Sequence, residues 1–274
     1  MVQVWPLFGL RVEAGPLSLS PVSDGDIPSL VRLAFAGIHQ PQVMPFAYPW
    51  TDAPARELGR NMAAYYWRTR AELAPASWSV DFAVRWRGEI VGVQGLITKD
   101  YPVTRSCETG SWLGLRHQGK GIGTLMRQTI CAFAFDHLEA REVTSSAWTD
   151  NAASLAVSAK VGYVENGRRR QARRTGELAT MQHLVLTPSR LVRHEFSLAV
   201  HGLHAVREFL GVEQAQTTGS NQSRVSGARC RAPLPSEPDL RVVPASGSGK
   251  PRRAVQVRED AGSWLPAPVA RRWQ

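Results

Sequence analysis

The sequence predicts an α/β (α+β) fold, in which helices flank a mixed, mostly antiparallel twisted sheet of six to seven strands. Pairs of apolar, alternating segments meet at turn residues such as Arg87-Gly88 and Thr175-Gly176, which is typical of β-hairpins. Other segments, such as 122–133, carry apolar residues at helical spacing. No apolar run approaches the roughly 20 residues that a membrane-spanning helix needs. We therefore expect a globular domain with both helices and hairpins.

The first third of the chain predicts two strands, a helix and a long loop. Short apolar segments at 7–12 and 17–19 are interpreted as the first strands. The helix that follows is expected to be capped by Asp24 or Asp26. A loop rich in proline and aromatic residues covers 39–50.

The second helix is expected to be capped by Thr51 or Asp52, with Pro54 in its first turn, and to run to about residue 73. Alternating or helical patterns place the remaining elements. The strands are expected at 80–87, 89–98, 107–115, 142–148, 163–173 and 178–186, and the helices at 122–135, 151–161 and 191–210.

The segment 116–124 carries the strongest functional signal. It holds three glycines between a predicted strand and a predicted helix, so its backbone N–H groups and the helix start can bind a phosphate or pyrophosphate. The spacing Gly119-x-Gly121-x-Gly123 fits neither the nucleotide P-loop nor the dinucleotide fingerprint. The sequence thus predicts a phosphate site of another type.

The pattern Arg-x-x-Gly-x-Gly at Arg116, Gly119 and Gly121 resembles the coenzyme A pyrophosphate loop of the GNAT family of N-acetyltransferases. A second motif, Asn151-x-x-Ser154 followed by Gly162-Tyr163, is similar to the signature of the family's RimJ/RimL-type ribosomal-protein branch. The resemblance covers about residues 8–188. It implies acetyl-CoA as acyl donor and direct transfer of the acetyl group, in a ternary complex, to a primary amine. The amine is a protein N-terminal α-amine or a small molecule.

The resemblance also implies where acetyl-CoA is held. Backbone amides of 113–115 would follow the pantetheine arm, those of 118–124 would surround the pyrophosphate, and Asn151 would reach the arm from its helix start. The implied cofactor-binding residues are Leu113, Leu115, Arg116, Gln118, Gly119, Lys120, Gly121, Ile122, Gly123, Thr124, Asn151 and Ser154. Arg116 and Lys120 add positive charge near the phosphates or are simply solvated.

Two residues are the catalytic candidates. Glu108, on the strand before the loop, lies at a position similar to the glutamate that acts as base in the histone-acetylating branch; the alternatives are a surface carboxylate and a water chain. Ser158 stands where many relatives carry the tyrosine that protonates the thiolate, and a hydroxyl there can still donate to the sulfur. The resemblance suggests that loop 39–50 shapes the acceptor pocket; packing on the core is the alternative.

Composition sets the remaining expectations. We expect a domain at 1–190, a helix at 191–213 packed on or appended to it, and a disordered, basic tail rich in proline, glycine and serine at 214–274. The tail is a solvated extension or a nucleic-acid or ribosome contact. The three cysteines are widely spaced, so we expect no disulfide framework, no metal site and a cytoplasmic location.

An alternative interpretation assigns the same fold to the chain but little or no catalytic activity. In this alternative the chain is a weak or inactive CoA-binding module, with its basic tail contacting nucleic acid or ribosome. In both readings acetyl-CoA binds and no membrane is involved; the enzyme also takes an amine acceptor, and a homodimer stays open.

Overall fold

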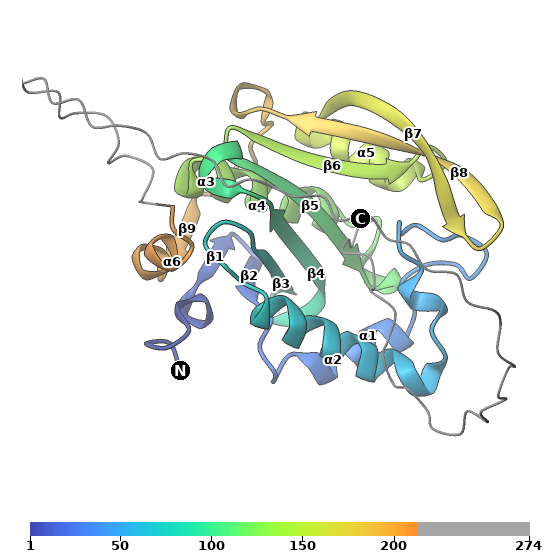
Figure 1. The fold of residues 1–274 in the computed structure, drawn as a ribbon, viewed down its shortest axis with the longest axis horizontal. Coiled ribbons are helices and arrows are strands. Elements are labelled where there is room, and N and C mark those ends of the chain that lie inside the picture. Colours follow the sequence, from blue (N-terminus) through green and yellow to red (C-terminus); the bar gives the residue numbers. More distant parts are fainter. Residues whose placement is uncertain (213–274) are drawn as a thin grey trace, which may run out of the picture. The chain divides into compact units, whose positions relative to one another are not determined.

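A computed structural model describes residues 1–212 of the 274-residue chain. Within them lies one sheet of nine strands (Figure 1). The strands are β1 (Arg11–Ala14), β2 (Leu17–Pro21), β3 (Ser79–Trp86), β4 (Glu89–Thr98), β5 (Ser106–Leu113), β6 (Glu142–Trp148), β7 (Val164–Arg174), β8 (Glu177–Leu186) and β9 (Leu198–His201). The helices are α1 (Ile27–Phe35), α2 (Ala55–Ala71), α3 (Tyr101–Thr104), α4 (Ile122–Leu138), α5 (Ala152–Val161) and α6 (Leu203–Phe209).

The strand order is β7-β8-β6-β5-β4-β3-β2-β1-β9. Every neighbouring pair is antiparallel except β5 and β6, which are parallel. This confirms the predicted mixed, mostly antiparallel fold. The expected six to seven strands were too few, and one of the nine, 198–201, was expected to be helical but pairs with β1.

The two hairpins expected from turn residues are present. At the β3–β4 turn, Arg87 and Gly88 both have positive φ, 52° and 86°, as a type I′ turn requires. At the β7–β8 turn Gly176 has φ +78°. In both cases a residue that tolerates the left-handed region sets the turn, so local sequence is enough to find it.

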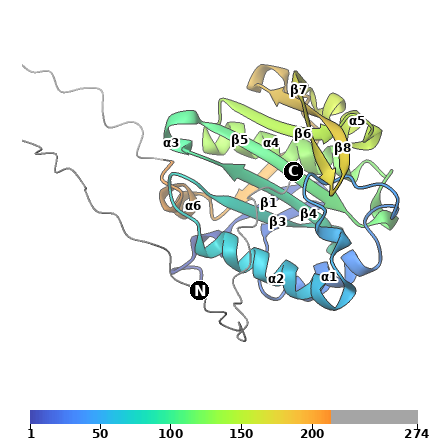
Figure 2. The same ribbon diagram turned by 45° about the vertical axis from the view of Figure 1, so that its right-hand side comes forward.

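Helices cover both faces of the sheet (Figures 1 and 2). On one face α4 and α5 pack against inward residues such as Phe82 and Leu96. On the other face α1, α2 and loop 39–50 pack against Ala83, Val93 and Trp112. Because strand side chains alternate, β3 sends Phe82 to the first face and Asp81 and Ala83 to the second. The position of Asp81 becomes important for the site.

The helix expected at 191–213 is wrong. Residues 198–201 form β9, and only Leu203–Phe209 are helical. Gly202 separates them with φ +72°, and a Cβ there would meet the Gly9 carbonyl oxygen at 2.3 Å. The free edge of β1 offers backbone hydrogen bonds to β9, and this pairing overrides the helical pattern. The tail expected at 214–274 lies outside the described residues.

Of the helix caps predicted for α5 and α2, the first is present and the second is not. The helix at 151–161 was expected to be capped by Asp150 or Asn151, and Asn151 is the cap, since its Oδ1 accepts the Ser154 N–H at 3.2 Å. The cap from Thr51 or Asp52 is wrong, because α2 begins at Ala55 after Pro54. Asp52 instead pairs with Arg174 of β7. In the described part of the chain no helix combines the length and apolarity needed to cross a membrane.

Candidate functional site

The sheet opens between its two parallel strands. β5 and β6 are paired only at Ser106↔Glu142, Cys107↔Val143 and Glu108↔Thr144. Both strands continue beyond this point, to Leu113 and Trp148, without pairing with each other. The backbone groups that the end of β5 directs toward β6 therefore line an opening, which we call the split.

A buried arginine from α4 reaches the split. Arg127 donates from Nη1 to Ser145 Oγ on β6 at 3.1 Å and from Nη2 to Ser111 Oγ on β5 at 2.9 Å. It is 4% exposed, and within residues 1–212 its Nε has no hydrogen-bond partner. Because an uncompensated buried cation is costly, the split is a favourable place for negative charge. Sequence reasoning took this residue only as part of a helix.

The glycine loop, 116–124, connects the end of β5 to α4. Gly119 and Gly121 have φ +71° and +80°, and a Cβ at either would meet nothing within 4 Å. Backbone conformation, not crowding, thus favours glycine at these two positions. Helix α4 begins at Ile122, so Ile122 and Gly123 have no intrahelical acceptor for their N–H groups. Left-handed glycines beside a helix start form an anion-binding concavity.

Three of the predicted cofactor-binding residues already use their backbone N–H groups in hydrogen bonds within the protein. The N–H groups of Leu115, Gln118 and Thr124 donate to the carbonyls of Gly37, Leu115 and Gly121 at 3.0, 3.2 and 3.1 Å. These three amides hold the loop, which leaves 119–123 as the donors best placed for a ligand.

The polar side chains of the loop also have partners. Gln118 Nε2 donates to the carbonyls of Ile38 and Leu113 at 2.7 and 2.8 Å, so this side chain ties the loop to the end of β5. Arg116 pairs with Glu89 and donates from Nε to His117 Nε2 at 2.8 Å. Burial and the neighbouring Arg116 lower the pKa of His117. Lys120 is exposed, so it is the one side chain of 119–123 that can bring charge to a phosphate.

Helix α5 brings the second motif beside α4. Asn151 uses its Oδ1 for the cap, which leaves its amide nitrogen as the group that can donate to a ligand. Ser154 is partly buried at the first turn. Ser158 is 1% exposed, and its Oγ has no hydrogen-bond partner in the described part of the chain. A buried hydroxyl without a partner is unusual, and a ligand acceptor would satisfy it.

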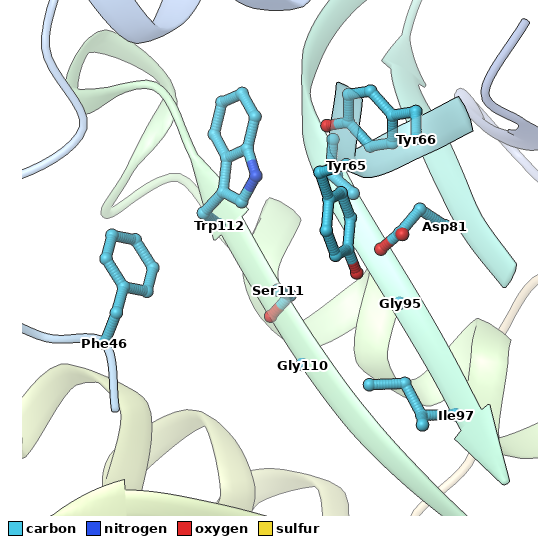
Figure 3. Close-up of a pocket in the computed structure, with 10 residues that line it drawn as sticks. Phe46, Tyr65, Tyr66, Asp81, Gly95, Ile97, Gly110, Ser111 and Trp112 are labelled. Atoms are coloured by element: carbon cyan, nitrogen blue, oxygen red, sulfur yellow. The ribbon is translucent and has the colours of Figure 1, made fainter. Parts of the chain in front are cut away.

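A pocket lies on the opposite face of the sheet, under α2 (Figure 3). We call it the aromatic pocket. Its floor is the cross-strand glycine pair Gly95 and Gly110. Its walls are the rings of Phe46, Tyr65, Tyr66 and Trp112, and Asp81 supplies the carboxylate.

Asp81 is the acidic group of this pocket. Its Oδ2 is inaccessible to solvent and has no hydrogen-bond partner among residues 1–212, while the Tyr65 hydroxyl donates to the carboxylate. Burial raises the pKa of Asp81 to about 6, and the Tyr65 hydrogen bond partly opposes that rise. Sequence reasoning missed this residue. The available signal was a single acidic residue inside the apolar, alternating strand 80–87.

Glu108, the predicted base, lies outside the pocket wall. It is partly buried on β5, pairs in register with Ile97 and Thr144, and shares a strand face with Gly110 and Trp112. The residues lining the aromatic pocket include Gly110 and Ser111 but not Glu108. The structure thus places a second carboxylate, Asp81, closer to the pocket than the predicted one.

Loop 39–50 packs on the core and also contributes one residue to the aromatic pocket. Met44, Phe46 and Trp50 are buried in the core under α1 and α2. Phe46 also lines the aromatic pocket, and its carbonyl accepts the Trp148 indole N–H at 3.1 Å. Packing of the loop on the core is therefore confirmed, and its role in shaping the acceptor pocket stays a prediction.

Other reactive groups lie away from the site. Cys107 and Cys131 are buried free thiols whose pKa values burial raises to about 12 and about 11, so neither is a ready nucleophile. Among residues 1–212, no group of three His, Cys, Asp or Glu side chains could hold a metal ion.

The chain matches a family profile and a curated relative. A profile of the family described as "Acetyltransferase (GNAT) domain" matches residues 17–164, more than half of the chain. YdaF of Bacillus subtilis (strain 168), provisionally named a ribosomal N-acetyltransferase, is 31% identical over 91 residues, which are 33% of this chain. The match spans about half (49%) of that relative's length.

Solved structures share the fold at low identity. RimJ from Mycobacterium smegmatis, in complex with CoA-disulfide, superposes with a TM-score of 0.58 at 23% identity, covering 68% of this chain and 88% of RimJ. A RimL, the ribosomal L7/L12 alpha-N-protein acetyltransferase in complex with coenzyme A, gives 0.52 at 18% identity, covering 63% and 94%.

Proposed function

The chain belongs to the GNAT acetyltransferase family, and we propose that it transfers the acetyl group of acetyl-CoA to a primary amine. The observation that carries this proposal is the backbone of the glycine loop. Gly119 and Gly121 have left-handed φ values and α4 begins at Ile122, so the N–H groups of 119–123 would bind a pyrophosphate. The split next to this loop would take the pantetheine arm.

The arm would extend along the edge of β5 toward Ser111. The amide of Gly114 donates to Val91 on β4, so strand alternation turns the Leu113 N–H toward the split. A pantetheine amide would pair with this free edge as an additional strand does. Asn151, through its amide nitrogen, would donate to the same arm from the start of α5.

The reaction requires the amine to lose protons and the thiolate to be stabilised as it leaves. Ser158 Oγ, buried without a partner, would donate to the thiolate sulfur. The buried cation Arg127 favours negative charge in the split while its hydrogen bonds hold Ser111 and Ser145. A carboxylate, Glu108 or Asp81, would accept the proton of the ammonium group.

The acceptor class follows from the family resemblance. The printed names of YdaF and RimL point to ribosomal proteins as acceptors of those two enzymes. For this chain the proposed acceptor is a protein α-amine or a small amine. The acceptor would enter on the α2 face, where the aromatic pocket meets β5.

A calorimetric titration of the full chain with acetyl-CoA tests the donor half of the proposal. We expect micromolar binding, followed by amine-dependent release of the free CoA thiol. Binding without release, across small amines and peptides with free N-termini, would favour a CoA-binding module over an enzyme. Absence of binding would contradict the proposal.

A further inference from the structure

The aromatic pocket combines features of a site for organic cations. Four rings, those of Phe46, Tyr65, Tyr66 and Trp112, line it together with the Asp81 carboxylate (Figure 3). Aromatic faces attract ammonium groups, and the attraction grows where water is excluded. Asp81 is the one carboxylate among the lining residues. An ammonium group would therefore find both a ring wall and a counter-charge.

The floor of the pocket is empty because two facing residues are glycines. Gly95 of β4 and Gly110 of β5 are cross-strand partners, and both line the pocket. A Cβ at Gly95 would lie 3.0 Å from Asp81 Oδ1 and 3.3 Å from the Gly110 carbonyl oxygen. The absence of a side chain at Gly95 thus keeps the space beside the Asp81 carboxylate open.

Asp81 itself is incompletely satisfied. Tyr65 donates one hydrogen bond to the carboxylate, and Oδ2 is left buried, with no partner in the part of the chain that the structure describes. The ionisable groups facing Asp81 from α2 are the two phenols Tyr65 and Tyr66; Arg70, further along α2, pairs with Asp24. On the sheet side its neighbour is Gly95. A buried anion in this position gains from a bound cation or from a proton.

The pocket and the split meet at β5. Ser111 lines the pocket, and its Oγ accepts the hydrogen bond from Arg127, which also bonds to Ser145 across the split. An amine nitrogen over Gly110 and Ser111 would therefore face the strand edge along which the thioester is proposed to lie. This is the direction from which the nitrogen must attack.

We propose that the aromatic pocket binds the acceptor as an alkylammonium ion and that Asp81, not Glu108, takes its proton. The inference rests on the proposed acetyl transfer. One ammonium proton moves to Asp81, the nitrogen forms a bond to the thioester carbonyl carbon, and the carbon–sulfur bond breaks. The nitrogen releases a second proton, the thiolate accepts one proton, and Asp81 returns the other to solvent. The substrates are thus amines that are protonated at neutral pH and carry an apolar group next to the nitrogen.

Binding tests the inference without knowledge of the natural acceptor. The probe is n-butylammonium, with n-butanol as an uncharged isostere, titrated into the full chain and followed by protein NMR. We expect Asp81→Asn to weaken n-butylammonium binding by about tenfold or more, because a buried charge pair is lost. Binding of n-butanol and acetyl-CoA should stay unchanged. Glu165→Gln, an exposed carboxylate on β7, serves as a control for charge and should alter none of the three.

The variant Glu108→Gln tests whether the competing carboxylate, Glu108, binds the ammonium ion instead. A larger loss of n-butylammonium binding in Glu108→Gln than in Asp81→Asn would overturn the inference, as would equal binding by the wild type and Asp81→Asn. Failure of the wild type to bind acetyl-CoA would instead contradict the proposed function, and the ammonium titration would still decide the role of the pocket.

The pH profile separates a proton acceptor from a merely structural residue. With n-butylamine as acceptor, kcat/KM of the wild type should fall below pH about 6, where Asp81 becomes protonated. Tyr65→Phe keeps the ring but removes the hydrogen bond that lowers the pKa of Asp81, so this limb should move to higher pH. A limb that stays in place in Tyr65→Phe and persists in Asp81→Asn would contradict the role of Asp81.

Discussion

The glycine loop and the aromatic pocket differ in how the chain builds them. The loop is nine consecutive residues, and its function depends on backbone N–H groups that local conformation exposes. The pocket is lined by residues from loop 39–50, from α2 and from three strands: Phe46, Tyr65, Asp81, Gly95 and Gly110. A site made of neighbours in sequence can be read from its spacing, whereas a site made by tertiary packing cannot. The proposed donor site could therefore be predicted from the sequence, and the proposed acceptor site could not.

Gly121→Glu should produce the largest effect and should act on the loop alone. The backbone is strained by a side chain at φ +80°, but nothing lies within 4 Å of the new Cβ, so the fold should survive. The carboxylate would lie in the phosphate concavity. We expect acetyl-CoA affinity measured by calorimetry to fall by about a hundredfold or more, since like charges in contact cost several kcal/mol.

Gly176→Glu is the matched control. Gly176, at the β7–β8 turn, has φ +78°, and likewise nothing lies within 4 Å of its Cβ position. The two variants share the strain and the added charge, and only the loop variant should lose acetyl-CoA. Equal affinities in both would remove the glycine loop from the donor site.

Asp81→Asn should make the folded protein more stable at neutral pH. The pKa of Asp81 is raised from 3.8 to about 6, so the native state binds this proton more tightly than the unfolded state. Wild-type stability therefore falls as pH rises from about 4 to 6, by about 3 kcal/mol in total, and the penalty persists above pH 6. Urea unfolding at pH 7.5 and pH 4 should show a stability gain that is large at the first pH and small at the second. A variant less stable than the wild type at pH 7.5 would show that Asp81 is structural.

Gly95→Ala should affect the pocket and spare the loop. Its methyl group would crowd Asp81 Oδ1 and the Gly110 carbonyl, at 3.0 and 3.3 Å, and fill part of the floor. We expect the KM for n-butylamine to rise by about tenfold, because small displacements of a bound reactant are costly. Acetyl-CoA affinity, measured on the same sample, should not change. A parallel loss of both ligands would point to a general distortion of the sheet.

Ser158→Ala should have the smallest effect. The removed hydroxyl is buried without a partner, so thermal stability should be equal or slightly higher. If the hydroxyl donates to the thiolate, kcat should fall by about fivefold, the value of one neutral hydrogen bond. The acetyl-CoA affinity serves as the internal control. An unchanged kcat would show that the thiolate leaves without help from Ser158.

The sequence predicted most elements whose signals are local. The turns at Arg87-Gly88 and Thr175-Gly176 and the cap at Asn151 each depend on the chemistry of a few adjacent residues, and all are present. The prediction of a helix at 191–213 was wrong because the edge of β1, which is distant in sequence, pairs with 198–201. Asp81 escaped notice because its burial depends on α2, and Arg127 because its partners lie on β5 and β6. Long-range packing decided each of these cases.

The division of labour between the two sites is the central claim, and a reciprocal titration tests it most directly. Acetyl-CoA and n-butylammonium would each be titrated into Gly121→Glu and Asp81→Asn. The account predicts that Gly121→Glu loses acetyl-CoA and keeps n-butylammonium, while Asp81→Asn does the opposite. Loss of both ligands in either folded variant, or of neither in both, would contradict it.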